Sequence, residues 1–107
     1  MIKKWSSIIL AVLILTIPLQ TDAFSSQVVE RGAFGDDVIE LQARLQYIGY
    51  YNGAIDGIFG YGTYWALRNF QQDYGLDVDG IAGASTKTAL ANNSQYNREW
   101  VMEQINK

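Results

Sequence analysis

The chain carries the stretch Asp56-Gly57-Ile58-Phe59-Gly60-Tyr61-Gly62-Thr63-Tyr64-Trp65-Ala66-Leu67 and, 23 positions later, the related stretch Asp79-Gly80-Ile81-Ala82-Gly83-Ala84-Ser85-Thr86-Lys87-Thr88-Ala89-Leu90. Asp, Gly, Ile, Gly, Thr, Ala and Leu recur at matching places in the two copies. Each copy has the pattern of a tight Asp-Gly turn followed by the start of a helix. This repeat, within only 107 residues, predicts one compact helical module rather than a long enzyme domain.

The two copies differ in their aromatic content. The first copy has Phe59, Tyr61, Tyr64 and Trp65 where the second has Ala82, Ala84, Lys87 and Thr88. We therefore expect the shared residues to build the fold and the aromatic excess of the first copy to carry the function.

Three helices are predicted from caps and apolar spacing. The first begins at Gly35-Asp36-Asp37, with Asp37 as N-cap and Glu40 completing a capping-box pair, and it ends at Gly49. Thr63 is expected to cap the second helix, and Thr86, or Ser85 beside it, the third. The predicted inward faces are Val38, Leu41, Leu45 and Ile48; then Ala66, Leu67, Phe70 and Tyr74; then Ala89 and Leu90. The fold class is therefore all-α, a small three-helix bundle over residues 30–92.

Both ends of the chain are predicted to lie outside this bundle. Lys3 and Lys4 precede the apolar run Ile8 to Ile17, a pattern typical of a secretory signal peptide over residues 1–23, with an uncleaved anchor as the alternative. Residues 93–107 have partial helical spacing, which predicts a fourth amphipathic helix leading to a linker that this chain lacks. Cleavage after Ala23 would leave six basic and ten acidic residues. That balance argues against binding to nucleic acid and against stable insertion in an anionic membrane.

The absence of cysteine and histidine removes several kinds of chemistry. Disulfides, Cys-His peptidases, Ser-His-Asp hydrolases and histidine-ligated zinc amidases are excluded. The segment Asp77-Val78-Asp79-Gly80 resembles part of a calcium loop, but Gly75 and Thr86 occupy positions where ligands are needed. The acidic cluster Asp36, Asp37 and Glu40 is explained by its place in a first helical turn. We expect no metal, no cofactor and no catalytic residue.

The binding residues are expected near the start of the second helix. Trp65 shares a helical face with polar Arg68 and Asn69, so it is expected to be exposed, with Tyr64 at the edge of that face. Exposed aromatic patches usually mark binding sites. The candidate ligand-binding residues are Tyr51, Phe59, Tyr61, Tyr64, Trp65, Arg68 and Asn69. For Phe59, a place in the core beneath the turn is an equal alternative.

Residues 31–90 resemble the peptidoglycan-binding module of bacterial cell-wall hydrolases. The matching pattern is Gly35-x-Asp37-Val38-x-x-Leu41-Gln42-x-x-Leu45, Gly49-Tyr50-Tyr51, Asp56-Gly57-Ile58-Phe59-Gly60-x-x-Thr63, Ala66-Leu67, Phe70-Gln71 and Asp79-Gly80-Ile81-Ala82-Gly83-x-x-Thr86-x-x-Ala89-Leu90. This resemblance implies a non-catalytic module that binds the glycan or the stem peptide of peptidoglycan. The alternatives are a module that binds a cell-wall or germination protein, and a truncated hydrolase.

Longer strings at both ends and in the middle of the mature chain resemble the N-terminal part of the Bacillus-type spore cortex-lytic enzymes. They are Phe24-Ser25-Ser26-Gln27-Val28, Tyr61 to Gln71, and Val101-Met102-Glu103-Gln104-Ile105-Asn106-Lys107. This resemblance implies a secreted protein of the cell wall or spore envelope of a Gram-positive, spore-forming bacterium. It also implies a partner catalytic domain, a lytic transglycosylase acting on spore cortex during germination, which this chain does not contain.

Overall fold

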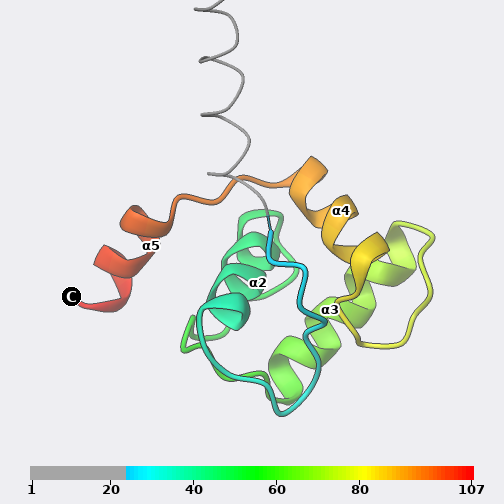
Figure 1. Ribbon diagram of the computed structural model, residues 1–107, viewed down its shortest axis with the longest axis horizontal. Coiled ribbons are helices and arrows are strands. Elements are labelled where there is room, and N and C mark those ends of the chain that lie inside the picture. The colour runs from blue at the N-terminus through cyan, green and yellow to red at the C-terminus, as the bar shows by residue number, and fades with distance from the viewer. Residues whose placement is uncertain (1–23) are drawn as a thin grey trace, which may run out of the picture.

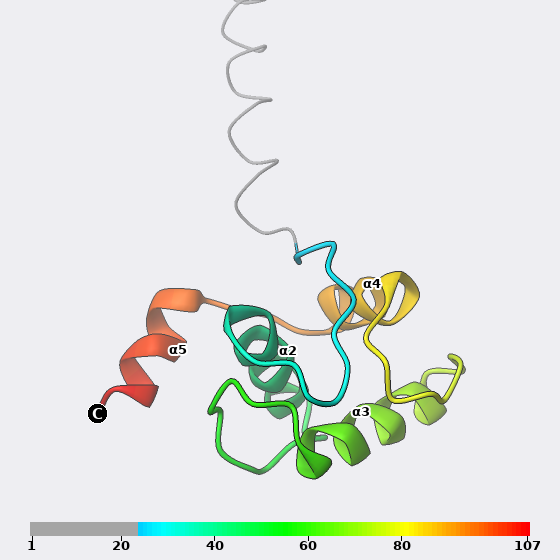
Figure 2. The ribbon, with the colours of Figure 1, turned by 60° about the horizontal axis from the view of Figure 1, so that its bottom comes forward.

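The computed structural model describes residues 24–107, so the predicted signal peptide lies outside the described residues. This part of the chain forms four helices, α2 (Asp36–Tyr47), α3 (Tyr61–Asp73), α4 (Ala84–Asn93) and α5 (Arg98–Ile105), and contains no named strand. Helix α2 packs against α3 and α4, while α5 stands to one side, joined to α4 by an extended link (Figures 1 and 2). The all-α prediction is confirmed, and the predicted fourth helix is present as α5.

The core forms where the apolar faces of α2, α3 and α4 meet. Its fully buried side chains include Val38, Leu41 and Leu45 from α2, Ala66, Leu67 and Phe70 from α3, and Leu90 from α4. These residues belong to the faces that the helical spacing predicted. Burial of each large apolar side chain contributes about 1.5–3 kcal/mol, which favours this packing over any other rotation of the helices.

The predicted helix caps are wrong. Helices α2, α3 and α4 follow Gly35, Gly60 and Gly83, and none of these N-caps makes a side-chain hydrogen bond. Thr63 and Thr86 lie inside the first turns and are buried, so their hydroxyls face the interior instead of capping a helix.

The expected capping box of α2 is absent as well. Asp37 lies inside the helix, and Glu40 pairs with Arg44 one turn further along, at 2.8 Å. Asp36 and Asp37 still place negative charge in the first turn, where the helix dipole favours it.

A segment before the first helix connects the two copies of the repeat. We call residues 28–34 the N-terminal strap. Val29 and Ala82 exchange backbone hydrogen bonds of 3.2 and 2.8 Å, and Phe59 N–H donates to the carbonyl oxygen of Ala33 at 2.9 Å. Phe59 and Ala82 occupy equivalent places in the two copies, and both are buried. The strap therefore pairs with the same position of each copy.

Candidate functional site

A buried glutamine holds the Asp-Gly turn of the first copy. Gln42 Nε2 donates to Asp56 Oδ1 at 3.1 Å, to the carbonyl oxygen of Ile58 at 3.0 Å and to Thr63 Oγ1 at 2.9 Å. Gln42 Oε1 accepts from the backbone N–H groups of Asp56 and Gly57, at 3.1 and 3.0 Å. One side chain thereby joins α2, the turn and the first turn of α3, which fixes where α3 begins.

A second buried glutamine does the same for the second copy. Gln71 Nε2 donates to Asp79 Oδ1 at 2.9 Å, to the carbonyl oxygen of Ile81 at 3.0 Å and to Thr86 Oγ1 at 3.1 Å. Its Oε1 accepts from the N–H groups of Asp79 and Gly80 at 3.1 and 2.9 Å. This network positions α4 as the Gln42 network positions α3.

The two aspartates also stabilise their own turns. Asp56 Oδ1 accepts from the N–H of Ile58 at 3.0 Å, and Asp79 Oδ1 accepts from the N–H of Ile81 at 2.9 Å. These backbone hydrogen bonds are the main reason that the pKa of each carboxyl lies below its usual value. The shared residues of the repeat are thus structural.

The aromatic residues of the first copy form an exposed row at the start of α3. Tyr61 and Trp65 are 67% and 55% exposed, and Tyr64 lies between them, half-buried. The Tyr64 ring meets Tyr61 and Trp65 edge to face, with centroids 6.5 and 5.2 Å away. Such pairs hold the rings in a defined arrangement.

Two arginines complete this row. The guanidinium carbon of Arg31 lies 5.0 Å from the centroids of both Tyr61 and Tyr64, and that of Arg68 lies 5.6 Å from Tyr64 and 5.4 Å from Trp65. Contacts of this kind contribute about 0.5–1 kcal/mol each at an exposed site. We call Arg31, Tyr61, Tyr64, Trp65 and Arg68 the aromatic surface.

The other predicted site residues lie in three different settings, in the core, at the edge of the core and on the exposed face of α3. Phe59 is 1% exposed and lies in the core, so its expected place in an exposed patch is wrong and the core alternative is correct. Tyr51 is half-buried against the core, and its hydroxyl donates to the carbonyl oxygen of Ala54 at 2.6 Å. Asn69 is exposed on α3.

Sequence reasoning missed three residues that matter here. Gln42 and Gln71 each follow a core residue in the helix that precedes an Asp-Gly turn, as Leu41-Gln42 and Phe70-Gln71. This repeated apolar-Gln pair before each turn is the sequence pattern that could have indicated the two buried glutamines. Arg31 gave no signal, since it lies in the strap, far from the repeat in sequence.

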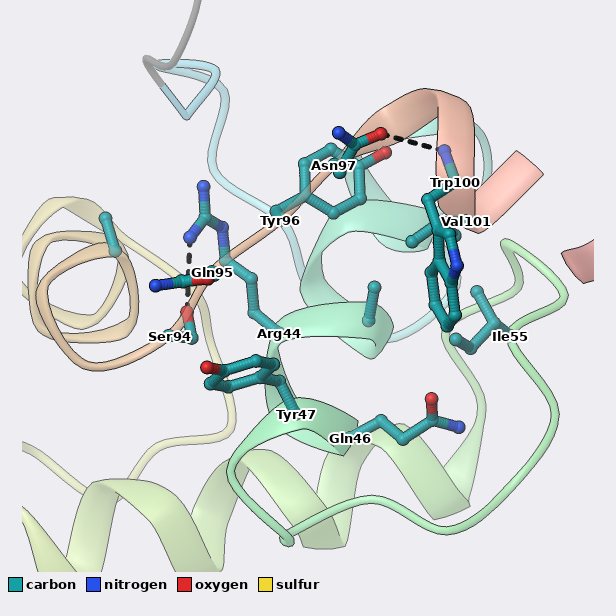
Figure 3. Close-up of a pocket in the computed structure, with 12 residues that line it drawn as sticks. Arg44, Gln46, Tyr47, Ile55, Ser94, Gln95, Tyr96, Asn97, Trp100 and Val101 are labelled. Carbon is teal, nitrogen blue, oxygen red and sulfur yellow. Dashed lines mark hydrogen bonds between the residues drawn. The ribbon is translucent and has the colours of Figure 1, made fainter. Parts of the chain in front are cut away.

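A separate pocket of about 690 Å³ lies between α2, the α4–α5 link and α5 (Figure 3). Tyr47 of α2 and Trp100 of α5 lie on different sides of it, with Arg44 and Ser94 at one end. The pocket shares no lining residue with the aromatic surface. Its lining residues are Ala43, Arg44, Gln46, Tyr47, Ile55, Ala91, Ser94, Gln95, Tyr96, Asn97, Trp100 and Val101.

Comparison with known protein families identifies the family to which this domain belongs. The family described as "Putative peptidoglycan binding domain" matches residues 34–90, more than half of the chain. The chain belongs to this family of peptidoglycan-binding domains. The match includes both glutamine networks and most of the aromatic surface, and it ends before α5.

Curated relatives of this peptidoglycan-binding domain include two spore cortex-lytic enzymes. The enzyme of Oceanobacillus iheyensis is 64% identical over 88 residues, which cover 82% of this chain and 32% of that protein. The enzyme of Bacillus subtilis is 67% identical over 86 residues, covering 79% of this chain and 28% of that protein. The chain thus spans about a third of the length of these relatives.

A solved structure shows the same domain in a relative. The crystal structure of the SleB N-terminal domain superposes with a TM-score of 0.67 at 63% sequence identity, covering 68% of this chain and all of that chain. The peptidoglycan-binding domain described here therefore resembles the N-terminal targeting domain of cortex-lytic enzymes. Within residues 24–107, no helix is both long and apolar enough to cross a bilayer.

Proposed function

We propose that this domain is a non-catalytic targeting module that holds a cortex-lytic enzyme on spore peptidoglycan, and that its aromatic surface contacts the glycan. The observation that supports this most is the row Arg31, Tyr61, Tyr64, Trp65 and Arg68, which is exposed and ordered by its own contacts, and whose three aromatic residues have no aromatic equivalent in the second copy.

The chemistry of the row suits a polysaccharide. Sugar rings present apolar C–H faces that pack on aromatic planes, and their hydroxyl and acetamido groups need hydrogen-bonding partners. The exposed amide of Asn69 and the guanidinium groups supply such partners. An arginine can also pair with a carboxylate of the stem peptide.

A single surface of this size is expected to bind weakly, with a dissociation constant between about 1 mM and 1 μM. Weak binding is sufficient for a tethered module, because linkage raises the effective concentration of the attached domain near the polymer. We propose that the tethered domain is a lytic transglycosylase that follows a linker after residues 93–107.

Secretion is part of the same proposal. Residues 1–23 have the signal-peptide pattern, and residues 30–92 are proposed as the binding domain, so the mature protein would act in the cell wall or spore envelope.

The experiment is a sedimentation assay of residues 24–107 with purified spore cortex and, in parallel, with vegetative cell wall. We expect co-sedimentation with cortex and no release of soluble muropeptides. Release of muropeptides would instead show a catalytic chain. Failure to sediment, together with capture of a germination or cell-wall protein in a matched pull-down, would favour the protein-interaction alternative.

A further inference from the structure

We propose that the pocket between α2 and α5 is a second saccharide site, which takes an uncharged N-acetylated sugar of the glycan strand. This inference rests on the proposed function for its ligand class, but not on the aromatic surface. The wall formed by residues 94–101 lies after residue 90, where the family match ends. The pocket is therefore a feature that α5 adds to the family fold.

The side walls of the pocket are aromatic. Tyr47 from α2 and Trp100 from α5 are 60% and 59% exposed, and Figure 3 shows them on different sides of the opening. Ile55 and Val101 add apolar surface beside Trp100. Flat rings on two sides suit a ligand with apolar ring faces, and a volume of about 690 Å³ is within the usual range for a small-ligand site.

The polar groups of the pocket are mostly amides. Gln46, Gln95 and Asn97 line it, and an amide both donates and accepts hydrogen bonds, as sugar hydroxyls and acetamido groups require. Asn97 Oδ1 already accepts from the N–H of Trp100 at 2.8 Å, which fixes the start of α5. The hydrogen bonds drawn in Figure 3 leave the amides of Gln46 and Gln95 available to a ligand.

The electrostatics of the pocket favour an uncharged ligand. Arg44 is the charged residue of the lining, and its guanidinium is neutralised by Glu40 at 2.8 Å. It also donates to Ser94 Oγ at 3.1 Å and lies 5.6 Å from the Tyr96 ring centroid. Arg44 is 5% exposed, so it acts as a positioning residue that fixes the α4–α5 link. With no carboxylate and no free cation in the described lining, the acidic stem peptide is a poorer match than the sugar.

Two sites on one domain have a consequence for binding to a polymer. The aromatic surface lies on α3 and the strap, whereas the pocket lies on α2 and α5, so one glycan network can occupy both. Simultaneous occupation makes the second contact intramolecular and raises the avidity without any strong single site.

The test is a titration of 15N-labelled residues 24–107 with soluble oligomers of N-acetylglucosamine, which carry neither charge nor peptide. The isolated domain is suitable because the SleB N-terminal domain was crystallised as a chain that this one covers completely. We expect chemical-shift changes at Tyr47, Gln95 and the Trp100 indole. Trp100→Ala and Tyr47→Ala should each weaken these changes by roughly two- to tenfold.

Phe34→Ala serves as the matched control, since Phe34 is an 82% exposed aromatic that belongs neither to the pocket lining nor to the aromatic surface, and its removal should leave the shifts at the pocket unchanged. Because Trp100→Ala can loosen α5, Gln95→Ala provides a second variant that removes only an exposed amide.

The outcomes separate the two proposals. Shifts confined to the aromatic surface would overturn the second site and leave the proposed function intact. Shifts at the pocket without sedimentation on cortex would support the site and count against the proposed function. Pocket shifts caused by an acidic stem-peptide fragment, and not by the oligomer, would overturn the ligand class.

Discussion

Gln71 repeats in the second copy five hydrogen bonds that Gln42 makes in the first. Each amide joins an aspartate carboxylate, a carbonyl oxygen, a threonine hydroxyl and two backbone N–H groups, with every distance between 2.9 and 3.1 Å. Both side chains are fully buried. Fully satisfied buried networks of this kind rigidify a core, and removal of one partner leaves the other groups desolvated and unpaired.

We predict that Gln71→Leu destabilises the domain by about 3 kcal/mol or more, because the N–H groups of Asp79 and Gly80 lose their acceptor and each unpaired buried group costs about 1–3 kcal/mol. The measurement is urea denaturation. Gln72→Leu, on the exposed neighbour, is the control and should change stability by less than about 0.5 kcal/mol. Equal midpoints for the two variants would show that the network contributes little.

We predict that Phe70→Ala costs about 3–5 kcal/mol, because Phe70 is completely buried and stacks on Tyr74 with ring centroids 4.3 Å apart. A domain of this size has only about 5 kcal/mol of stability, so the variant should be largely unfolded at room temperature. Circular dichroism melts provide the measurement. A cooperative melt close to that of the wild type would contradict the described core.

The lowered pKa values of Asp56 and Asp79 predict a loss of stability in acid. The folded-state pKa of each lies below the unfolded value of about 3.9, so the stabilisation is present above pH 4 and is lost as the pH falls through the folded-state pKa. We expect the double variant Asp56→Asn and Asp79→Asn to show a weaker dependence of stability on pH below about 4. The neutral amide keeps an acceptor oxygen but does not titrate.

The comparison requires unfolding curves of both proteins at several pH values between about 2 and 6. Burial raises the pKa of Glu40, so the ionisation of this carboxyl lowers the stability of the fold as the pH rises. Glu40 is present in both proteins, and its contribution to the pH dependence of stability therefore cancels when the two are compared. Identical pH slopes would contradict the prediction.

We predict that Trp65→Ala weakens co-sedimentation with peptidoglycan several-fold, because a stacked aromatic contributes about 1 kcal/mol. The fold should be nearly unchanged, since Trp65 is 55% exposed. Thr88→Ala is the matched control, because Thr88 is the exposed equivalent in the second copy and carries no ring. If Trp65→Ala sediments as well as the wild type while both variants melt normally, the aromatic surface is not the glycan site.

Lys87 is predicted to anchor the residues that lead into the N-terminal strap. Its ammonium donates to the carbonyl oxygens of Ser25, at 2.6 Å, and Gln27, and it is 6% exposed. Hydrogen bonds from charged groups contribute about 1.5–3 kcal/mol, so Lys87→Met should speed amide hydrogen exchange at Val29 and Ala82 by roughly tenfold or more. Lys107→Met, at an exposed lysine, should leave these rates unchanged.

The parts of the fold that depend on apolar spacing and Asp-Gly turns were predictable from sequence. Phe70 and Leu67 fall on the face that is buried, and Gly57 and Gly80 adopt φ values of 75° and 71°, as the turns require. The caps were not predictable in the same way. A threonine near a helix start favours capping, but a glutamine from another helix competes for the same hydroxyl, and that partner is close only in the folded chain.

The candidate site was predicted in part. Periodicity placed Trp65 on the exposed side of α3, whereas it gave no information on Phe59, which precedes the helix and is buried by pairing with the strap. Arg31 reaches the aromatic surface, and α5 completes the pocket, only through tertiary packing. Contacts of this kind have no signature in a local pattern.

The strap has a consequence for anyone who wishes to transplant the domain onto another enzyme. The family match begins at residue 34, yet Val29, Lys87 and Ala82 tie the preceding segment to the second copy, and Arg31 belongs to the aromatic surface. A fusion that begins at residue 34 would lack Arg31, which forms one side of the proposed ligand surface. It would also leave the backbone N–H and C=O groups of Ala82 without their hydrogen-bonding partners on Val29. A portable version should start at Phe24.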